Sequence, residues 1–432
     1  MERKHKAQLR FFACLLAAAA LATLGPATAQ SRADFEPAPA LAAAELAPAA
    51  LLKGPLHTVA EPVTVDGYFG RFVIESKYGR FSVLGVNMLA ERVNELRAIE
   101  ALHQVQRSAA FQDALRNSAT APMKFVASAA DEPAKSVETM GQGPGSVLGR
   151  AGYVATSGAE AAGGAASDHK SAPAASASPS ATTVQSEPPA RPGDPFGYHK
   201  ARREWARQLD IDPYTTNPVL RRLLDNTAAA SLAANSTVSA ALGAVAAPLN
   251  VAAGLDATVR DAVWNQAASD LARQNEEKLL ALGVGERAVR DLQRNRWFTP
   301  TLQTALVGAL AEVGRIEGVE FVIFAASRTK DETRARFLVD SVRMLARHHA
   351  QESRLVKLAM SQSVPVGIAG DGKRVAATAI DYAYWDRNAA TFVHRKELAG
   401  TQRTLLVAGK ASSRAQQQFD QAGLTLRGGL RP

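Results

Sequence analysis

The residues best suited to chemistry lie in the last third of the chain. Ser327 and Arg328 follow the apolar run Val319–Ala325, and Asp381 and Lys410 each follow another predicted strand. In an open α/β sheet, ligands gather at the carboxyl ends of parallel strands, so parallel pairing would bring these four residues to one edge. A hydroxyl, a carboxylate and two cations at that edge could bind a ligand or support hydrolysis. This candidate site depends on the strands being parallel.

The sequence Ser327-Arg-Thr-Lys330 has the Ser-x-x-Lys spacing of serine acyl-enzymes of the penicillin-binding and β-lactamase type. In that arrangement the serine opens a helix, and the lysine lies beside its hydroxyl one turn later. Here Thr329-Lys-Asp-Glu332 has the pattern of a capping box, which predicts Thr329 as the helix cap and leaves Ser327 outside the helix. A companion Lys-Thr-Gly sequence is absent. We therefore interpret the spacing as accidental.

Three further patterns could hold a cofactor or an ion, but a structural interpretation is favoured for each. Gly283-Val-Gly-Glu-Arg-Ala288 has the glycine spacing of a dinucleotide-binding turn, yet a predicted helix precedes it. His348, His349 and Glu352 could suggest a metal site, but adjacent histidines on a helix point about 100° apart. Gly409-Lys-Ala-Ser412 could hold an anion, but it lacks the first glycine of a phosphate loop. We predict no metal and no cofactor.

A group of arginines defines a candidate surface for an anionic partner. Arg287, Arg290 and Arg294 fall on one side of a short predicted helix, and Arg296 and Trp297 follow closely. Basic groups with a neighbouring aromatic ring suit a phosphate-bearing partner, which here would be anionic lipid or a cell-wall polymer rather than nucleic acid. A solvated arginine face remains the default interpretation.

The first 29 residues have the three parts of a secretory signal peptide. Met1–Arg10 is basic, Phe11–Leu24 is apolar apart from Thr23, and Ala27-Thr-Ala29 is a small-residue cleavage site. An uncleaved anchor is the alternative, but the apolar run is short for a membrane span. The sole cysteine, Cys14, lies in this leader, so the mature chain would have no disulfide. We expect an exported product, periplasmic or extracellular.

Composition indicates a chain that can bury a core. Of its 432 residues, 47% are hydrophobic and 21% are charged. The formal net charge is +9, of which the predicted leader carries a third. The remaining excess is far from the footprint of a nucleic-acid-binding protein.

The N-terminal half is predicted to contain one small module between flexible segments. Residues 30–55 are rich in alanine and proline and are predicted to be a flexible lead-in. Within a module over residues 56–150, Phe69–Ile74 and Tyr78–Val83 have the alternation of paired strands, and an amphipathic helix follows. The charged face of that helix, with Glu91, Arg92, Glu95 and Arg97, could receive a partner helix, although solvation is the favoured interpretation. Residues 151–195 are predicted to be a disordered linker.

Residues 196–318 are predicted to be helical, and their boundaries have clear local signals. Asp212–Asn217 forms a corner in which Asn217 caps a helix with Pro218 at its first position. Thr299-Pro300 repeats this device. One further helix is expected from Asp256 to Gly283. The run 226–255 has no charged residue; a packed pair of helices is favoured over a membrane-inserting hairpin.

The final section, residues 319–432, is predicted to be α/β and to pack on the helical region. Val319–Ala325 is expected to be a buried strand because it is continuously apolar. A helix from the capping box to about His349 follows. A hairpin is expected across Gly370-Asp-Gly372, then two strands around a short helix that ends at Gly423.

The sequence therefore predicts an α+β fold: a mostly helical main body with a small C-terminal α/β section, plus a small N-terminal β-hairpin and helix module. The favoured function is that of an exported, non-enzymatic envelope protein that binds a partner protein or an anionic envelope component. A periplasmic hydrolase or ligand-binding enzyme with its site in the C-terminal section is one alternative. A membrane-active protein that uses residues 226–255 is the other.

Overall fold

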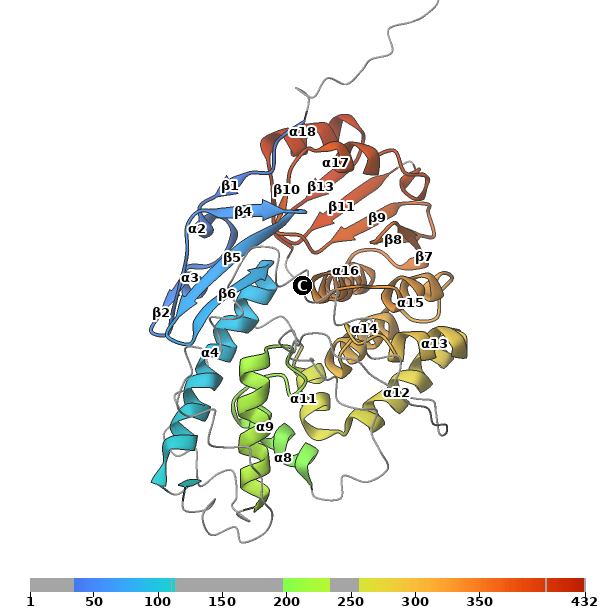
Figure 1. Ribbon diagram of the computed structural model, residues 1–432. Coiled ribbons are helices and arrows are strands. Elements are labelled where there is room, and N and C mark those ends of the chain that lie inside the picture. Colours follow the sequence, from blue (N-terminus) through green and yellow to red (C-terminus); the bar gives the residue numbers. More distant parts are fainter. Residues whose placement is uncertain (1–34, 110, 113–196, 234–255, 401, 431–432) are drawn as a thin grey trace, which may run out of the picture.

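The computed structural model describes residues 35–109, 111–112, 197–233, 256–400 and 402–430. It is a mixed α+β fold with an N-terminal β module, as predicted. Figure 1 shows the N-terminal sheet on the left, the C-terminal sheet above and most of the helices below. The predicted leader 1–29, the linker 151–195 and the greater part of the uncharged run lie outside the described residues.

The N-terminal sheet is antiparallel throughout, and its longest strand lies at its centre. Its six strands are β1 (Ala40–Leu41), β2 (Lys53–Gly54), β3 (His57–Val59), β4 (Val63–Asp66), β5 (Phe69–Ser76) and β6 (Gly79–Leu84). Strand β5 pairs with β4 and β3 on one side and with β6 on the other. Alternate side chains of β5 point into the core, where Phe72 and Ile74 are fully buried. The predicted pairing of Phe69–Ile74 with Tyr78–Val83 is confirmed.

The turn between β4 and β5 needs two left-handed residues. Gly67 has φ of 55° and Tyr68 has φ of 73°. Positive φ at both central residues is typical of the type I′ turn, whose twist matches that of the strands it joins. Gly67 adopts the first of these conformations without strain because it has no Cβ atom.

The predicted flexible lead-in is ordered over residues 36–55, contrary to expectation. It forms β1, β2 and the short helices α2 (Ala43–Leu46) and α3 (Ala49–Leu52). Leu46 and Leu51 are buried beneath the sheet. Glu36 binds the C-terminal section: its backbone N–H donates to the carbonyl of Trp385 at 2.8 Å, and its carboxylate accepts from the Trp385 N–H at 2.6 Å. The alanine-rich composition predicted a flexible segment because composition alone carries no information about contacts with residues far away in the sequence.

Helices make up the middle of the chain. They are α4 (Val86–Arg107), α8 (Tyr198–Gln208), α9 (Pro218–Ala233), α11 (Ala257–Asn265), α12 (Ala268–Ala281), α13 (Glu286–Gln293), α14 (Pro300–Val313), α15 (Val319–Ser327) and α16 (Glu332–Gln351). Both predicted cap-plus-proline starts are confirmed. Asn217 Oδ1 accepts from the backbone N–H of Val219 at 3.1 Å, and Thr299 Oγ1 accepts from that of Leu302 at 3.3 Å.

Two expectations for this region are corrected. The helix predicted from Asp256 to Gly283 is two helices, because Gln266 and Ala267 are extended and both pieces pack on α14. The cap of α16 is Asp331, whose Oδ1 accepts from the Arg334 N–H at 2.8 Å. The Thr329 hydroxyl instead donates to a carbonyl in the last turn of α15.

The apolar run predicted as a buried strand is the helix α15. Its buried residues are Val319, Val322, Ile323 and Ala326, which recur at helical spacing. A short apolar run is compatible with either structure, and here the helical period places Phe321 and Phe324 on the solvent side. Gly318 precedes the helix with φ of 92° and lies against the Leu358 backbone so closely that a Cβ atom would have no room.

The C-terminal section contains a mixed five-stranded sheet in the order β13-β11-β9-β8-β7. Strands β9, β11 and β13 are parallel, and the confirmed β8–β9 hairpin adds antiparallel strands at one edge. Strand β7 and helix α17 were not predicted. The elements are β7 (Leu355–Ser361), β8 (Val364–Ala369), β9 (Arg374–Thr378), β10 (Tyr382–Ala383), α17 (Arg387–Phe392), the 3₁₀ turn Lys396–Leu398, β11 (Arg403–Val407), β12 (Lys410–Ala411), α18 (Ser413–Gln421) and β13 (Thr425–Arg427).

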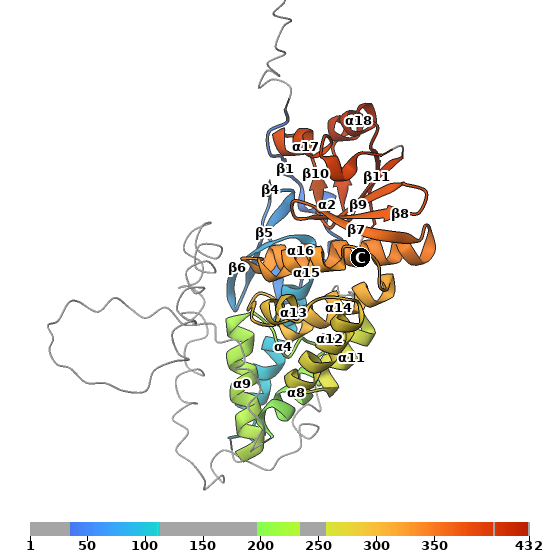
Figure 2. The ribbon, with the colours of Figure 1, turned by 90° about the vertical axis from the view of Figure 1, so that its right-hand side faces the viewer.

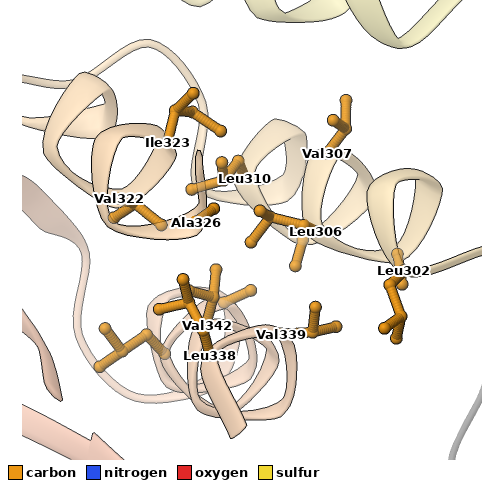
Figure 3. Close-up of a cluster of buried hydrophobic side chains, with 14 of the residues drawn as sticks. Leu302, Leu306, Val307, Leu310, Val322, Ile323, Ala326, Leu338, Val339 and Val342 are labelled. Carbon is orange, nitrogen blue, oxygen red and sulfur yellow. The ribbon is translucent and has the colours of Figure 1, made fainter. Parts of the chain in front are cut away.

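Helix α16 lies between the C-terminal sheet and the other helices (Figure 2). Figure 3 shows Leu338, Val339 and Val342 of α16 facing Leu306 of α14 and Val322 of α15. All five side chains are buried, and α16 also packs against β8 and β9 of the C-terminal sheet.

The N-terminal module is packed on the helical region rather than tethered beside it. Helix α4 packs against α9, and one buried cluster includes Leu96 of α4, Trp205 of α8 and Leu220 of α9. The sequence alone had not indicated how these two parts are placed relative to each other. Of the helices in the described residues, none combines the length and the apolar character needed to cross a bilayer.

Candidate functional site

The structure places two of the four predicted ligand-binding residues side by side. Strand β12 pairs in parallel with β10, and the Lys410 backbone N–H donates to the Asp381 carbonyl at 2.9 Å. A Cβ atom on Gly409 would lie 1.9 Å from that carbonyl oxygen, so only glycine permits the approach. The parallel pairing of β9 and β11 is the reason that these loops meet.

The Asp381 side chain is engaged in holding the fold together. Its Oδ2 accepts from the Gly70 N–H at 2.9 Å, and its Oδ1 accepts from the Val86 N–H at 3.1 Å. Val86 is the first residue of α4, where unpaired N–H groups and the helix dipole favour a carboxylate. Asp381 therefore joins the C-terminal section to both the N-terminal sheet and α4.

Ser327 and Arg328 lie elsewhere, at the end of α15 on the right of Figure 1, whereas β10 is at the upper left. The Ser327 hydroxyl donates to the Phe324 carbonyl at 2.9 Å. The Arg328 guanidinium lies over the Phe324 ring, 4.1 Å from its centroid. Ser327 ends a helix rather than opening one, so the Ser-x-x-Lys geometry is not formed. The four predicted ligand-binding residues therefore form two separate pairs, Asp381 with Lys410 and Ser327 with Arg328.

Arg294 joins the Ser327 pair at a shallow surface depression between α13 and α15. The lining residues are Asp291, Arg294, Asn295, Phe324, Ser327 and Arg328. Arg287 and Arg294 are exposed on α13, and Arg290 forms an ion pair with Glu286 at 3.0 Å. Arg296 turns to the Trp297 ring, 4.6 Å from its centroid. Of the predicted arginine group, only Arg294 lines this depression.

The two histidines near the end of α16 face different partners. His348 Nδ1 lies 3.3 Å from a Glu352 oxygen, and Glu352 also pairs with Arg427. His349 Nδ1 accepts from the Leu355 N–H at 3.0 Å, which ties the helix to the start of β7. Burial lowers the pKa of both rings.

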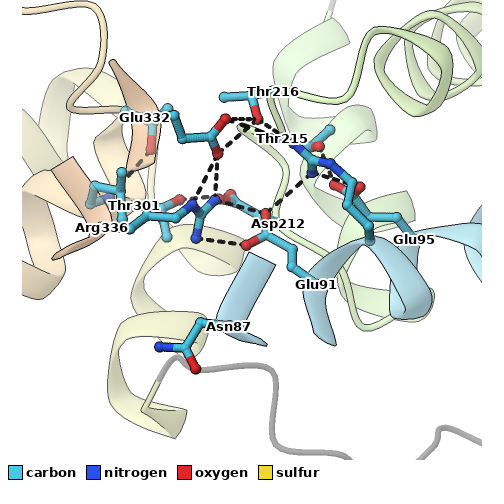
Figure 4. A network of polar contacts seen from close by, with 12 residues as sticks. Asn87, Glu91, Glu95, Asp212, Thr215, Thr216, Thr301, Glu332 and Arg336 are labelled. Atoms are coloured by element: carbon cyan, nitrogen blue, oxygen red, sulfur yellow. Dashed lines mark hydrogen bonds and ion pairs between the residues drawn. The ribbon is translucent and has the colours of Figure 1, made fainter. Parts of the chain in front are cut away.

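The most concentrated polar chemistry lies where α4, α16 and the Asp212 corner meet, a place the sequence did not reveal. We call it the buried ionic centre (Figure 4). It consists of Glu91, Arg92, Glu95, Asp212, Glu332 and Arg336.

Two arginines organise the carboxylates of this centre. Arg336 Nη1 lies 2.6 Å from a Glu91 oxygen, and Arg336 Nη2 lies 2.8 Å from Glu332. Arg92 Nη1 lies 2.7 Å from Glu95, and Arg92 Nη2 lies 3.7 Å from Glu332. Glu332 therefore faces both guanidinium groups and links the two halves of the network.

The corner between α8 and α9 supplies the neutral partners. The Thr215 hydroxyl and the Asn217 amide both donate to Glu95, the amide at 2.9 Å. The Thr216 hydroxyl donates to Glu332 at 2.8 Å and accepts from Arg92 at 2.8 Å. Asp212 accepts from the Thr301 hydroxyl at 2.6 Å. The polar residues of this corner thus satisfy buried charges, in addition to ending and starting helices.

The pKa values of the carboxyl groups in this centre are shifted in opposite directions. Burial raises the pKa of Glu91 to about 7, although Arg336 opposes the shift. Burial also raises the pKa of Asp212. At Glu332 burial acts in the same sense, but Arg336 and Arg92 outweigh it and the pKa is lowered. Both carboxylates lie 3.8 Å or less from both guanidinium groups, but Glu332 also accepts a hydrogen bond from the Thr216 hydroxyl. The neighbouring charges of Glu95 and Glu332, in contrast, raise the pKa of Glu91.

A carboxyl with a pKa near neutrality can act as an acid or base, which makes Glu91 a candidate for chemistry. Its carboxylate, however, is held by Arg336 within a packed junction. The depression between α13 and α15 is lined by other residues, as is a second one along α18. The arrangement is suited to fixing the relative positions of α4, α16 and the corner.

The solvated interpretation of the α4 polar face is wrong for Glu91, Arg92 and Glu95, which the corner and α16 cover. Glutamate and arginine on one helix face were the available signal. A second signal was the density of hydrogen-bonding residues from Asp212 to Asn217. Neither pattern indicates which residues elsewhere in the chain it would contact.

Comparison with known proteins finds no family model, no curated protein and no solved structure that matches the chain.

Proposed function

We propose that the protein is an exported, non-enzymatic envelope protein that binds an anionic envelope component through a surface formed by α13 and α15. We call this surface the basic–aromatic face and define it by Arg287, Arg294, Phe321, Phe324 and Arg328. The proposal of export rests on the signal-peptide pattern in the first 29 residues.

The observation that carries the proposal is the exposure of two phenylalanines beside arginines. The side chains of Phe321 and Phe324 are 49% and 53% exposed. The two neighbouring rings form a small exposed apolar patch, and burying it against a partner would be favourable. Arg328 lies against Phe324, so a cation and an aromatic ring are presented together.

The charge of the face favours an anionic partner. Within the described part of the chain, Arg287, Arg294 and Arg328 form no ion pair, although all three are exposed. Asp291 on α13 and Glu320 on α15 are also exposed, so the face presents three arginines against two carboxylates. Unpaired guanidinium groups can bind phosphate or carboxylate oxygens without first breaking an internal ion pair.

Binding rather than catalysis is favoured because the candidate catalytic groups are used in the fold. Asp381 holds the N-terminus of α4, and Ser327 bonds the backbone of its own helix. The hydrolase hypothesis required these two residues to share a cleft with Lys410. Their separation is the reason that we do not propose it.

The test uses the protein purified as exported, with two anionic probes: dextran sulfate in solution and vesicles of phosphatidylglycerol. Phosphatidylcholine vesicles and neutral dextran are the uncharged controls. We expect binding to at least one anionic probe, weakened by added salt and by the triple substitution Arg287→Gln, Arg294→Gln and Arg328→Gln.

The matched control is Arg80→Gln on β6, which removes one charge from an arginine whose side chain is 62% exposed on the N-terminal sheet. This variant should bind as the unsubstituted protein does. The proposal is overturned if neither anionic probe is bound, or if the triple variant binds both as well as the unsubstituted protein.

A further inference from the structure

We infer that the anionic component bound by the basic–aromatic face is the headgroup layer of a phospholipid membrane, into which Phe321 and Phe324 insert their rings. This inference rests on the proposed function, and it names the partner of that same surface.

The geometry of α15 supports shallow insertion. Phe321, Phe324 and Arg328 follow one another at spacings of three and four residues, so they share one face of the helix. Val322 and Ile323 face the core, which anchors the helix to the protein. A helix attached in this way can rest flat on a surface with its outward rings at the level of the boundary between headgroups and acyl chains.

The small apolar area favours a membrane over a protein partner. Of the four large apolar side chains that are exposed in the described residues, Phe321 and Phe324 are the two on α15. Two half-exposed rings offer roughly 200 Å² of apolar surface, since a phenylalanine can bury about 150–250 Å². A stable protein interface usually needs about 800 Å² on each partner. Interfacial insertion depends on individual rings rather than on a broad flat area.

The position of the cations fits phosphate groups at the same depth. Arg328 lies on the Phe324 ring, so insertion of that ring would bring its guanidinium to the headgroup phosphates. Arg294 lines the same depression from α13. A soluble polyanion would engage these arginines but would gain little from the two rings.

The experiment separates the two components of binding in the exported protein. We expect Phe321→Ser/Phe324→Ser to bind phosphatidylglycerol vesicles at least about tenfold more weakly than the unsubstituted protein. Its binding to dextran sulfate should not change. The thermal unfolding midpoint should fall only modestly, because about half of each ring is exposed in the folded protein.

A second variant measures how deeply the side chain at position 324 enters the membrane. In Phe324→Trp, the added indole should be quenched by phosphatidylglycerol carrying brominated acyl chains, beyond the quenching seen for the unsubstituted protein. The inference is overturned, with the proposed function intact, if the double serine variant binds vesicles normally or if only dextran sulfate is bound. Absence of added quenching also overturns it. If the protein binds neither probe, the proposed function fails as well.

Discussion

Arg336 on α16 and Glu91 on α4 form an ion pair between elements 245 positions apart in the sequence, with 2.6 Å between Nη1 and Oε2. The same guanidinium binds Glu332 on its own helix. Both side chains of the long-range pair are at least four-fifths covered. A buried pair of this kind contributes little net stability, but removing one partner leaves an uncompensated buried charge.

Removing the arginine should therefore destabilise the fold strongly. In Arg336→Met, Glu91 and Glu332 lose their shared counter-charge in a buried position, and the expected cost is about 3–5 kcal/mol. Urea unfolding of the two proteins at the same pH would measure it. Arg334→Met on the exposed side of α16 is the matched control, with an expected change below about 0.5 kcal/mol. Equal losses in the two variants would contradict a special role for Arg336.

The raised pKa of Glu91 predicts a pH dependence of stability with a defined sign. Because the folded-state pKa of about 7 exceeds the ordinary value of 4.5, the folded protein holds this proton more tightly than the unfolded chain. The stabilising contribution of Glu91 to the free energy of unfolding is complete at pH values below the unfolded-state pKa. It is lost as the pH rises through the folded-state pKa. We expect Glu91 to lower the free energy of unfolding, by on the order of 2 kcal/mol, between about pH 5 and about pH 8.

Glu91→Gln isolates this contribution, because the amide cannot titrate. The four buried histidines act in the opposite direction: burial lowers the pKa of His57, His103, His348 and His349, so their contribution is lost as pH falls. The measured quantity is the difference in unfolding free energy between the unsubstituted protein and the variant across that pH window. A difference that is constant with pH would show that Glu91 does not titrate there.

Local signals in the sequence predicted the starts of helices and the pairing of neighbouring strands. Asn217 and Thr299 cap helices because the cap and its receiving N–H groups lie within three residues of each other. Phe69–Ile74 and Tyr78–Val83 pair across a short turn for the same reason. In these cases the residues that interact are close in sequence, so local propensities were sufficient to predict the structure.

The buried ionic centre could not be predicted, because it exists only when α4, α16 and the corner meet. Glu91 and Arg92 have the pattern of a solvated helix face, and nothing local identifies Arg336 or Thr216 as their partners. For Phe321 and Phe324 the error was the reverse: the two side chains were predicted to be buried and are exposed. Continuous apolar sequence suggested a buried strand, whereas helical packing of Val322 and Ile323 leaves the two rings exposed.

Asn217 has a second role that enlarges the expected effect of its loss. As a helix cap alone, Asn217→Ala should cost about 1 kcal/mol. Its amide also donates to buried Glu95 at 2.9 Å, and losing that hydrogen bond to a charged group should bring the total to about 2–3 kcal/mol. Thr299→Ala, a comparable cap with no such contact among the described residues, should cost about 1 kcal/mol in the same unfolding assay. Equal costs would mean that the Glu95 contact contributes nothing.

Asp381→Asn tests whether this residue joins the C-terminal section to the N-terminal part or serves a ligand. The carboxylate accepts one N–H on each oxygen, from Gly70 and Val86. An amide keeps the shape but presents its own NH₂ to one of these donors, so one hydrogen bond is replaced by a repulsive contact. We expect a loss of about 2 kcal/mol in the free energy of unfolding.

Asp420→Asn, on the exposed side of α18, is the control for removing one negative charge and should leave the unfolding midpoint unchanged. Amide hydrogen exchange would locate the effect. Asp381→Asn should speed exchange at Val86 and in the first turn of α4, because the side chain that binds those N–H groups is impaired. Unchanged stability and unchanged exchange at α4 would return Asp381 to the list of candidate ligand-binding residues. Loss of stability with faster exchange at α4 would place it among the contacts that hold the two sheets together.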